Sequence, residues 1–368
     1  MDLNKPSTSK KSKVLSCVIF LFLVLTLLCG CSSNQAPVTT AAPGERIQDV
    51  ITHGSFSDQV ETIEWSIDEG GVRIYDSSQA GIGFVRPEDR HTQPSRLSQN
   101  DELRLDSGEP LKVDLVINAA QESTFLITAI VDYKQVPFML DEKFGLLHEV
   151  SIKNEGALYV PLQIDISGSG AHDFIIMAFR DPYNRDRWDE NERDLGQGCI
   201  VTGKRAVIII DDNDLPFKDV TPDVQGVSQP AEVDFGLRVM FANSPASILD
   251  KSHPSKRQMS FIQTGKASRT FPYQLWLSNY ELPDAVVDYG LMRFFDFHQV
   301  DFVGRDLFIA HFDGQQEVIV DDDITLPDQA GLHELQIVYV FDPYKSVLNQ
   351  EVLARYVFSS SCVGIDVD

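Results

Sequence analysis

Apolar and polar residues alternate along much of the chain, and this pattern predicts β-strands. Leu111, Val113, Leu115 and Ile117 fall on one face of such a strand, because successive side chains of a strand point to opposite faces. The same alternation runs over 158–166 and, interrupted by Asp322, over 318–326. Turn residues separate these segments, and no long segment has convincing helical periodicity. We therefore expect an all-β chain of antiparallel sandwiches.

Three further segments, 174–179, 207–210 and 335–341, are almost continuously apolar. Such runs are typical of strands that are buried on both faces. We expect them to be central strands.

Four short segments recur in the same order, with a spacing that drifts slowly, and this predicts a duplicated domain. The paired segments are Gly71–Tyr75 with Gly236–Met240, Asp132–Phe138 with Asp296–Phe302, Gly170–Phe174 with Gly331–Leu335, and Asp181–Tyr183 with Asp342–Tyr344. We expect one repeat over 49–215 and the other over 216–368.

The polar turns before the strands at 174–179 and 335–341 contain His172 and His333. These corners resemble the E–F corner of immunoglobulin-like domains, where a Tyr bonds back to the backbone. The Tyr and the Cys…Trp…Cys pattern of antibody domains are absent. The resemblance is thus to the broad class of immunoglobulin-like sandwiches, not to antibody domains. It implies two tandem immunoglobulin-like antiparallel β-sandwiches. We expect each His to be a buried imidazole that donates to a backbone carbonyl, not a metal ligand or a catalytic group.

The N-terminus has the pattern of an exported protein. Four lysines within 1–13 precede an apolar run over 14–28, which is the order of regions in a signal peptide. The run ends in Leu28-Cys29-Gly30-Cys31, which resembles the lipobox of bacterial lipoproteins. The resemblance implies that 1–30 is cleaved and that Cys31 is lipidated. The alternative is an uncleaved signal anchor.

Residues 31–48, rich in Ser, Thr, Ala and Pro, are predicted to be a flexible spacer. We expect a lipid-anchored protein on the cell membrane or outer membrane, facing the periplasm or the exterior.

Charge and cysteine usage narrow the choice of partners. The formal net charge is −24, which repels the phosphate backbone and excludes nucleic-acid binding. Removal of 1–30 leaves Cys199 and Cys362, besides Cys31, among the five cysteines, without metal-type spacing. We expect both to be buried as small apolar residues. The alternative is a bridge between the repeats.

The segment 180–194 is the most promising recognition loop. It mixes acidic residues with Tyr183, Arg185, Arg187 and Trp188, and Tyr, Trp and Arg are common anchors of binding sites on loops. We expect these four residues to contact a glycan or an envelope protein. The alternative is that Trp188 folds back on its own domain.

The junction between the repeats carries a weaker metal prediction. Asp211, Asn213 and Asp214 resemble the linker by which cadherin domains hold Ca²⁺ between neighbours, although Pro216 comes one residue early. Ca²⁺ takes six to eight oxygen ligands, so further acids would be required. The alternative is a solvated polar turn.

No motif predicts an enzyme, since the sequence has no H-E-x-x-H, no P-loop and no nucleophile elbow. The sequence therefore predicts a non-enzymatic binding, adhesion or envelope-assembly module without a required cofactor. The alternative is an envelope enzyme or its accessory carbohydrate-binding component.

Overall fold

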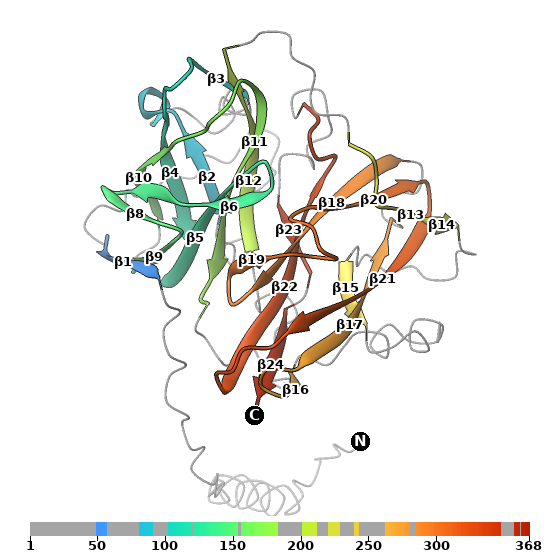
Figure 1. Cartoon of the computed structure of the whole chain (residues 1–368). Coiled ribbons are helices and arrows are strands. Elements are labelled where there is room, and N and C mark those ends of the chain that lie inside the picture. Colours follow the sequence, from blue (N-terminus) through green and yellow to red (C-terminus); the bar gives the residue numbers. More distant parts are fainter. Residues whose placement is uncertain are drawn as a thin grey trace, which may run out of the picture. The chain divides into compact units, whose positions relative to one another are not determined.

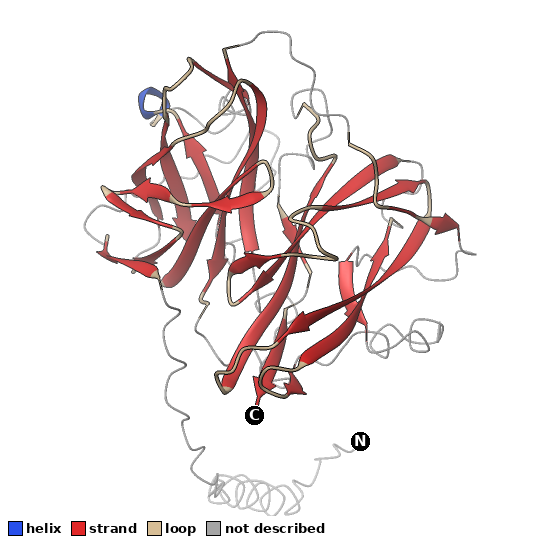
Figure 2. Ribbon diagram, in the orientation of Figure 1, coloured by secondary structure: helices blue, strands red, loops and turns tan. Residues whose placement is uncertain are grey.

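The computed structural model describes residues 49–56, 81–90, 102–119, 121–153, 156–182, 201–211, 220–228, 239–242, 262–279, 285–346, 357–360 and 362–368. The regular elements among them are β-strands, apart from one short 3-10 helix, η2 (Pro87–Asp89) (Figure 2). The all-β prediction is therefore confirmed. The predicted signal peptide, Cys31 and the spacer lie outside these residues and stay predictions. Within the described ranges, no helix is long and apolar enough to cross a membrane.

The first repeat has two sheets. The larger has seven strands in the order β1–β9–β5–β11–β12–β3, with β6 beside β5. These strands are β1 (Val50–Ser55), β3 (Glu102–Leu105), β5 (Ser123–Val131), β6 (Lys134–Val136), β9 (Leu147–Ile152), β11 (Gly170–Arg180) and β12 (Val201–Ile210). The smaller sheet has the order β2–β4–β10–β7–β8. Its strands are β2 (Gly81–Val85), β4 (Leu111–Ala119), β7 (Phe138–Leu140), β8 (Lys143–Gly145) and β10 (Gly156–Ile164).

The second repeat also has two sheets. Its larger sheet has the order β13–β20–β18–β22–β24–β16, with β19 beside β18 and β23 beside β22. These strands are β13 (Val224–Gln225), β16 (Ile262–Gly265), β18 (Val286–Phe295), β19 (His298–Val300), β20 (Phe308–Asp313), β22 (Gly331–Phe341), β23 (Phe358–Ser359) and β24 (Val363–Val367). The smaller sheet, in the order β14–β21–β17–β15, contains β14 (Val227–Ser228), β15 (Val239–Ala242), β17 (Thr270–Ser278) and β21 (Gln316–Thr325).

The two larger sheets have the same strand order, as a duplicated fold requires (Figure 1). In the first repeat this order is β1, β9, β5, β11, β12 and β3. The corresponding strands of the second repeat, in the same order, are β13, β20, β18, β22, β24 and β16. The sheets are antiparallel except at their edges. In the first repeat, β1 runs parallel to β9 and β3 runs parallel to β12. In the second repeat, β13 runs parallel to β20 and β16 runs parallel to β24.

One sequence alignment of the repeats is wrong. β15 pairs with β17 through Val239 and Phe241 as β2 pairs with β4 through Ile82 and Phe84. The counterpart of β15 is therefore β2, not the segment 71–75, which lies outside the described residues.

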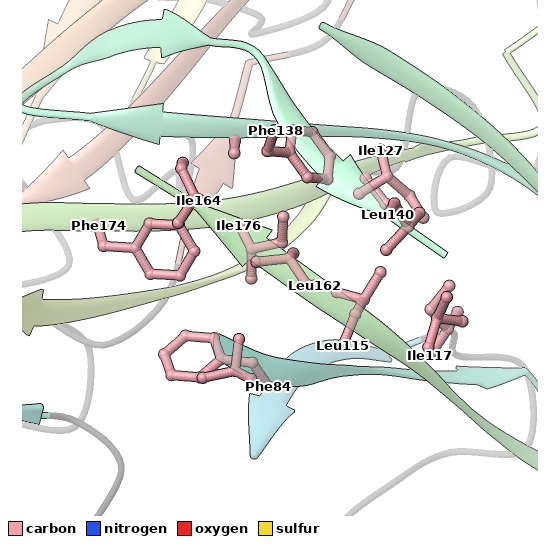
Figure 3. Close-up of a cluster of buried hydrophobic side chains, with 14 of the residues drawn as sticks. Phe84, Leu115, Ile117, Ile127, Phe138, Leu140, Leu162, Ile164, Phe174 and Ile176 are labelled. Atoms are coloured by element: carbon pink, nitrogen blue, oxygen red, sulfur yellow. The ribbon is translucent and has the colours of Figure 1, made fainter. Parts of the chain in front are cut away.

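Each repeat has its own core between its two sheets. The strands predicted from alternation are β4, β10 and β21, and their apolar faces point into these cores. In the first repeat, Leu115, Leu162 and Ile164 from one sheet meet Phe174 and Ile176 from the other (Figure 3). Asp322, which interrupts the pattern of β21, accepts hydrogen bonds from Arg293 Nη1 at 2.6 Å and Tyr273 OH at 2.5 Å. A carboxylate that is largely removed from solvent, as the Asp322 side chain is at 11% exposure, needs such partners.

A third apolar cluster joins the repeats. It contains Ile175 and Phe179 of β11 together with Phe294 of β18 and Val338 of β22. The ring centroids of Phe179 and Phe294 lie 5.7 Å apart. The two large sheets are thus buried on both faces. This explains why the segments now identified as β11 and β22 are almost continuously apolar, and it confirms that they are central strands.

Gly203 of β12 lies close to both the neighbouring strand β11 and the second repeat. A Cβ atom there would meet Ile176 O, Met177 Cβ and Val357 Cγ2, each at 2.9 Å. Gly203 O also accepts a hydrogen bond from Val357 N at 3.4 Å. A glycine is therefore needed for the second repeat to approach β12.

Cys362 is fully buried, as predicted, but it is disulfide-bonded. The expected burial is therefore confirmed for this residue, and the disulfide agrees with the alternative of a bridged cysteine. The other four cysteines, Cys199 included, lie outside the described residues.

Candidate functional site

The predicted recognition loop falls outside the described residues. Tyr183, Arg185, Arg187 and Trp188 all belong to the range 183–200, which follows the end of β11. The structure therefore leaves the loop prediction as it was, and the candidate site below comes from other residues.

The predicted Ca²⁺ linker is only partly described. Asp211 has a left-handed φ of 60°, and its Oδ1 accepts a hydrogen bond from Ser107 N at 2.7 Å. This carboxylate oxygen therefore caps a turn of the first repeat. Asn213 and Asp214 lie beyond the described residues. In the described part of the chain, no three His, Cys, Asp or Glu side chains gather in a way that could hold a metal ion.

The two corner histidines bind a carboxylate that sequence analysis did not identify. His172 Nδ1 lies 2.8 Å from Asp132 Oδ2, and His333 Nδ1 lies 2.6 Å from Asp296 Oδ2. His333 Nε2 also lies 3.0 Å from Gln329 O, as the corner prediction requires. No such carbonyl contact of His172 is found in the described ranges, and its buried Nε2 has no partner there. The prediction therefore holds for His333 and is wrong in this detail for His172.

These pairs have a structural role in the hairpin turns. Asp132 and Asp296 also accept the backbone N–H groups of Asp173 and Glu334. Both Asp residues and the aromatic residues after them, Tyr133 and Phe297, have φ between 47° and 67°, the backbone of a two-residue type I′ turn. Burial lowers the pKa of His333, but the hydrogen bond and charge of Asp296 outweigh it and raise that pKa above its ordinary value.

A buried polar cluster lies where the repeats meet. Arg205 Nε donates to Asp173 Oδ1 at 2.7 Å, and Tyr133 OH donates to Asp173 Oδ2 at 2.7 Å. From the second repeat, Tyr344 N donates to Asp173 Oδ2 at 2.8 Å, and Phe341 O accepts from Arg205 Nη1 at 2.8 Å. The side chains of Arg205 and Asp173 are fully buried. Because these hydrogen bonds satisfy both charges, the cluster is a structural joint between the repeats.

A buried histidine pair ties β1 to the hairpin formed by β7 and β8. His53 Nε2 lies 2.9 Å from His148 Nδ1, and His148 Nε2 lies 3.2 Å from both Phe138 O and Gly145 O. Burial, reinforced by the charge of His53, lowers the pKa of His148 to about 4. Burial likewise lowers the pKa of His53. Both imidazoles are therefore neutral near pH 7.

The candidate site is a pocket of about 610 Å³ on the outer face of the smaller sheet of the first repeat. This volume is in the range of small-molecule sites. Its described lining is Pro87, Arg90, Lys112, Val113, Asp114, Met139, Glu142, Pro161, Leu162 and Gln163. Strand register explains why these residues meet. Met139 of β7 faces Gln163 of β10, which faces Lys112 of β4.

One end of the pocket is a preformed ion pair. Arg90, just after η2, donates from Nε to Asp114 Oδ2 at 3.0 Å, and its Nη2 lies 2.9 Å from Asp114 Oδ1. The Arg90 guanidinium also lies over the ring of Tyr159, 5.6 Å from its centroid. Asp114 is only 3% exposed. The bidentate pair thus fixes the segment 86–90 over the sheet and forms a rigid wall.

The rest of the rim offers groups that no other side chain uses. In the described structure, Lys112, Glu142 and Gln163 have no hydrogen bond or ion pair from their side chains. Glu142 sits in the two-residue β7–β8 turn, where Asp141 and Glu142 have φ of 46° and 64°, the backbone of a type I′ hairpin turn. The pocket can therefore offer a cation, an anion and an amide beside the apolar surfaces of Met139 and Pro161.

The pocket was not evident from the sequence because its lining residues come from four separated segments. The only signal was the outward face of the alternating strands at 111–117 and 158–166, where Lys112, Asp114, Pro161 and Gln163 stand opposite the core positions. An outward polar residue on a strand is ordinarily solvated, so the pattern alone did not indicate a site.

No protein-family model matches the sequence, and no curated protein matches it. Among solved structures, a CARDB domain from Pyrococcus furiosus is 10% identical over 28% of this chain and 85% of that domain, with a TM-score of 0.21. CBD12 from CALX1.2 is 8% identical over 72% of this chain and 96% of its own, with a TM-score of 0.18. Alpha-2-macroglobulin from E. coli is 9% identical over 80% of this chain and 17% of its own, with a TM-score of 0.23. Similarity at these levels says nothing of function.

Proposed function

We propose that this chain is a non-enzymatic binding or envelope-assembly module, held at a membrane by a lipid on Cys31. The observation that carries the proposal is the pocket over β4 and β10. Its wall is fixed by the Arg90–Asp114 pair, while Lys112, Glu142 and Gln163 remain available to a ligand. Binding sites combine rigid walls with a few convergent polar groups in this way.

The pocket chemistry favours a small polar ligand or a peptide segment that carries both signs of charge. Lys112 would pair with an acidic group, Glu142 with a basic one, and Gln163 would form hydrogen bonds with an amide or a hydroxyl. The apolar surfaces of Met139 and Pro161 would cover the carbon skeleton between these groups. A ligand with a single charge leaves one rim charge unpaired and is expected to bind more weakly.

Binding can be tested with the purified protein on arrays of envelope glycans and short peptides. We expect retention of one class of zwitterionic ligand, and loss of this retention in Lys112→Glu. The control is Lys153→Glu, which makes the same charge change at another exposed position of the first repeat. Equal retention by both variants would rule out the pocket as the binding site.

Anchoring requires a separate test, because the N-terminus lies outside the described residues. Cells that express the full chain can be fed a labelled fatty acid. We expect the label on the wild-type protein and none on Cys31→Ser. Label on both proteins would show that Cys31 is not the lipidated residue.

A further inference from the structure

The two repeats differ at one edge of their smaller sheets. In the first repeat, β7 lies antiparallel along β10, with Leu140 beside Leu162 and Met139 beside Gln163, and β8 completes the hairpin. In the second repeat, the chain between β19 and β20 makes a tight turn instead. There Phe302 and Arg305 exchange backbone hydrogen bonds of 2.8 and 3.1 Å. Between β19 and β20, which the structure describes throughout, the second repeat therefore has no hairpin like the one that covers β10.

As a result, one side of β21 is largely uncovered by the described chain. β17 pairs with β21 along Glu317–Thr325, whereas β14, on the other side, pairs only with Gln316 and Glu317. Among the described residues, no strand lies along that side from Val318 to Thr325.

Burial supports the same conclusion. The inward residues Val318, Val320 and Ile324 of β21 are 8%, 7% and 6% exposed. Inward residues of β10, which has strands on both sides, are 2% exposed or less: Leu158, Val160, Leu162 and Ile164. The core of the second repeat is therefore less well covered at this edge.

Acidic residues determine what this edge can accept. Asp321 and Asp323 are exposed, and Ile319 on the same face is 39% exposed. Two copies of this edge would bring like charges together, which discourages pairing between copies. A strand with basic side chains would instead complement the charge.

We propose that the outer edge of β21, from Val318 to Thr325, binds an extended basic segment of a partner protein as an added antiparallel strand. The bound segment would lie beside β21 in the position that β7 has beside β10 in the first repeat. Backbone hydrogen bonds to the open edge supply affinity, and Asp321 and Asp323 select Lys or Arg side chains. This site lies on the second repeat and does not depend on the pocket of the first.

The full chain can be tested with the acetylated and amidated peptide Lys-Val-Lys-Val-Lys-Val-Lys. A second peptide, with Pro in place of each Val, has the same charge but cannot form the backbone ladder. We expect the Val peptide to bind at least about tenfold more tightly than the Pro peptide, and to slow amide hydrogen exchange within 318–325. Equal binding of the two peptides, or slowed exchange only elsewhere, would overturn the proposal.

A charge-reversal pair provides the matched control. The variant Asp321→Lys with Asp323→Lys should weaken binding of the Val peptide by about tenfold or more. The variant Glu122→Lys with Asp165→Lys makes the same change at exposed positions of the first repeat and should bind like wild type. Equal weakening in both variants would mean that net charge alone attracts the peptide, and it would contradict the assigned edge.

Discussion

Gln135 and Gln299 bind each other's backbone across the junction between the repeats. Gln135 N donates to Gln299 Oε1 at 2.6 Å, and Gln299 N donates to Gln135 Oε1 at 2.8 Å. Their amide groups also donate to Phe297 O and Tyr133 O, respectively. The two residues occupy equivalent places in the duplicated segments. The junction therefore has the reciprocal contacts of an isologous dimer interface, formed within one chain.

Removal of either glutamine should destabilise the junction by a similar amount. Gln135→Ala and Gln299→Ala each leave a backbone N–H and a carbonyl without their partner, so we expect a loss of about 1–3 kcal/mol in the free energy of unfolding. Chemical denaturation measures this loss. Gln163→Ala, which removes an amide from the pocket rim, should cost less than about 0.5 kcal/mol. A large loss for only one of the two junction glutamines would contradict the symmetric junction.

Substitution of Asp173 in the buried polar cluster should destabilise the protein more than substitution of either junction glutamine. Asp173→Ala leaves the guanidinium of Arg205 buried without a carboxylate, and we expect it to cost about 3–5 kcal/mol in the free energy of unfolding. Arg205→Met together with Asp173→Leu removes both charges and should cost clearly less than Asp173→Ala. If the double variant were as unstable as the single one, the unpaired charge would not be the cause.

Acid should weaken the fold through His148. Its pKa in the folded protein is about 4, below the ordinary value near 6.5. Between these values the unfolded chain binds a proton that the folded chain does not. The free energy of unfolding should therefore fall as the pH drops from 6.5 toward 4, by up to about 3 kcal/mol, and this term should be constant above pH 6.5.

This pH dependence can be assigned with variants. His148→Gln should flatten the decline between pH 6.5 and 4, whereas His298→Gln, at the half-buried first position of β19, should leave it unchanged. Denaturation at a series of pH values compares the three proteins. An equally steep decline in His148→Gln would mean that other groups cause the acid sensitivity.

Cys362 should be linked to Cys199. Cys17 and Cys29 belong to the predicted signal peptide and Cys31 is the predicted lipidation site, so Cys199 is the remaining candidate partner. The described chain agrees, because Val357 contacts Gly203 at the start of β12. Peptide mapping without reductant should recover the Cys199–Cys362 pair. Reduction should lower the free energy of unfolding by about 2–5 kcal/mol. Recovery of Cys362 as a free thiol would contradict this account.

The strands could be predicted from the sequence because a strand with one face in the core and the other in solvent alternates apolar and polar residues. Leu111–Ile117 and 158–166 became β4 and β10 for this reason. The apolar runs at 174–179 and 335–341 could likewise be predicted to be central strands. Their second buried face, however, belongs to contacts such as Phe179 with Phe294, and one-dimensional periodicity does not say which element covers a face.

The polar sites were less predictable, because their partners are far apart in the sequence. Asp132 and His172 were both visible in the repeated segments, but nothing in the sequence indicated that they bind each other. Arg90 and Asp114 belong to no motif, and their pairing depends on how the segment 86–90 folds over the sheet. Duplication was the useful signal: positions kept in both repeats, such as Gln135 and Gln299, proved to be structural.

Affinity across a set of charge-swapped pocket variants tests the proposed function most directly. Lys112→Glu should abolish binding of the ligand retained by wild type, and Lys112→Glu with Glu142→Lys should restore part of it, because the rim again offers one charge of each sign. Titration calorimetry with that ligand measures all three proteins. Partial recovery in the double variant is the predicted result. Binding that is the same in wild type and Lys112→Glu would contradict a ligand site over β4 and β10.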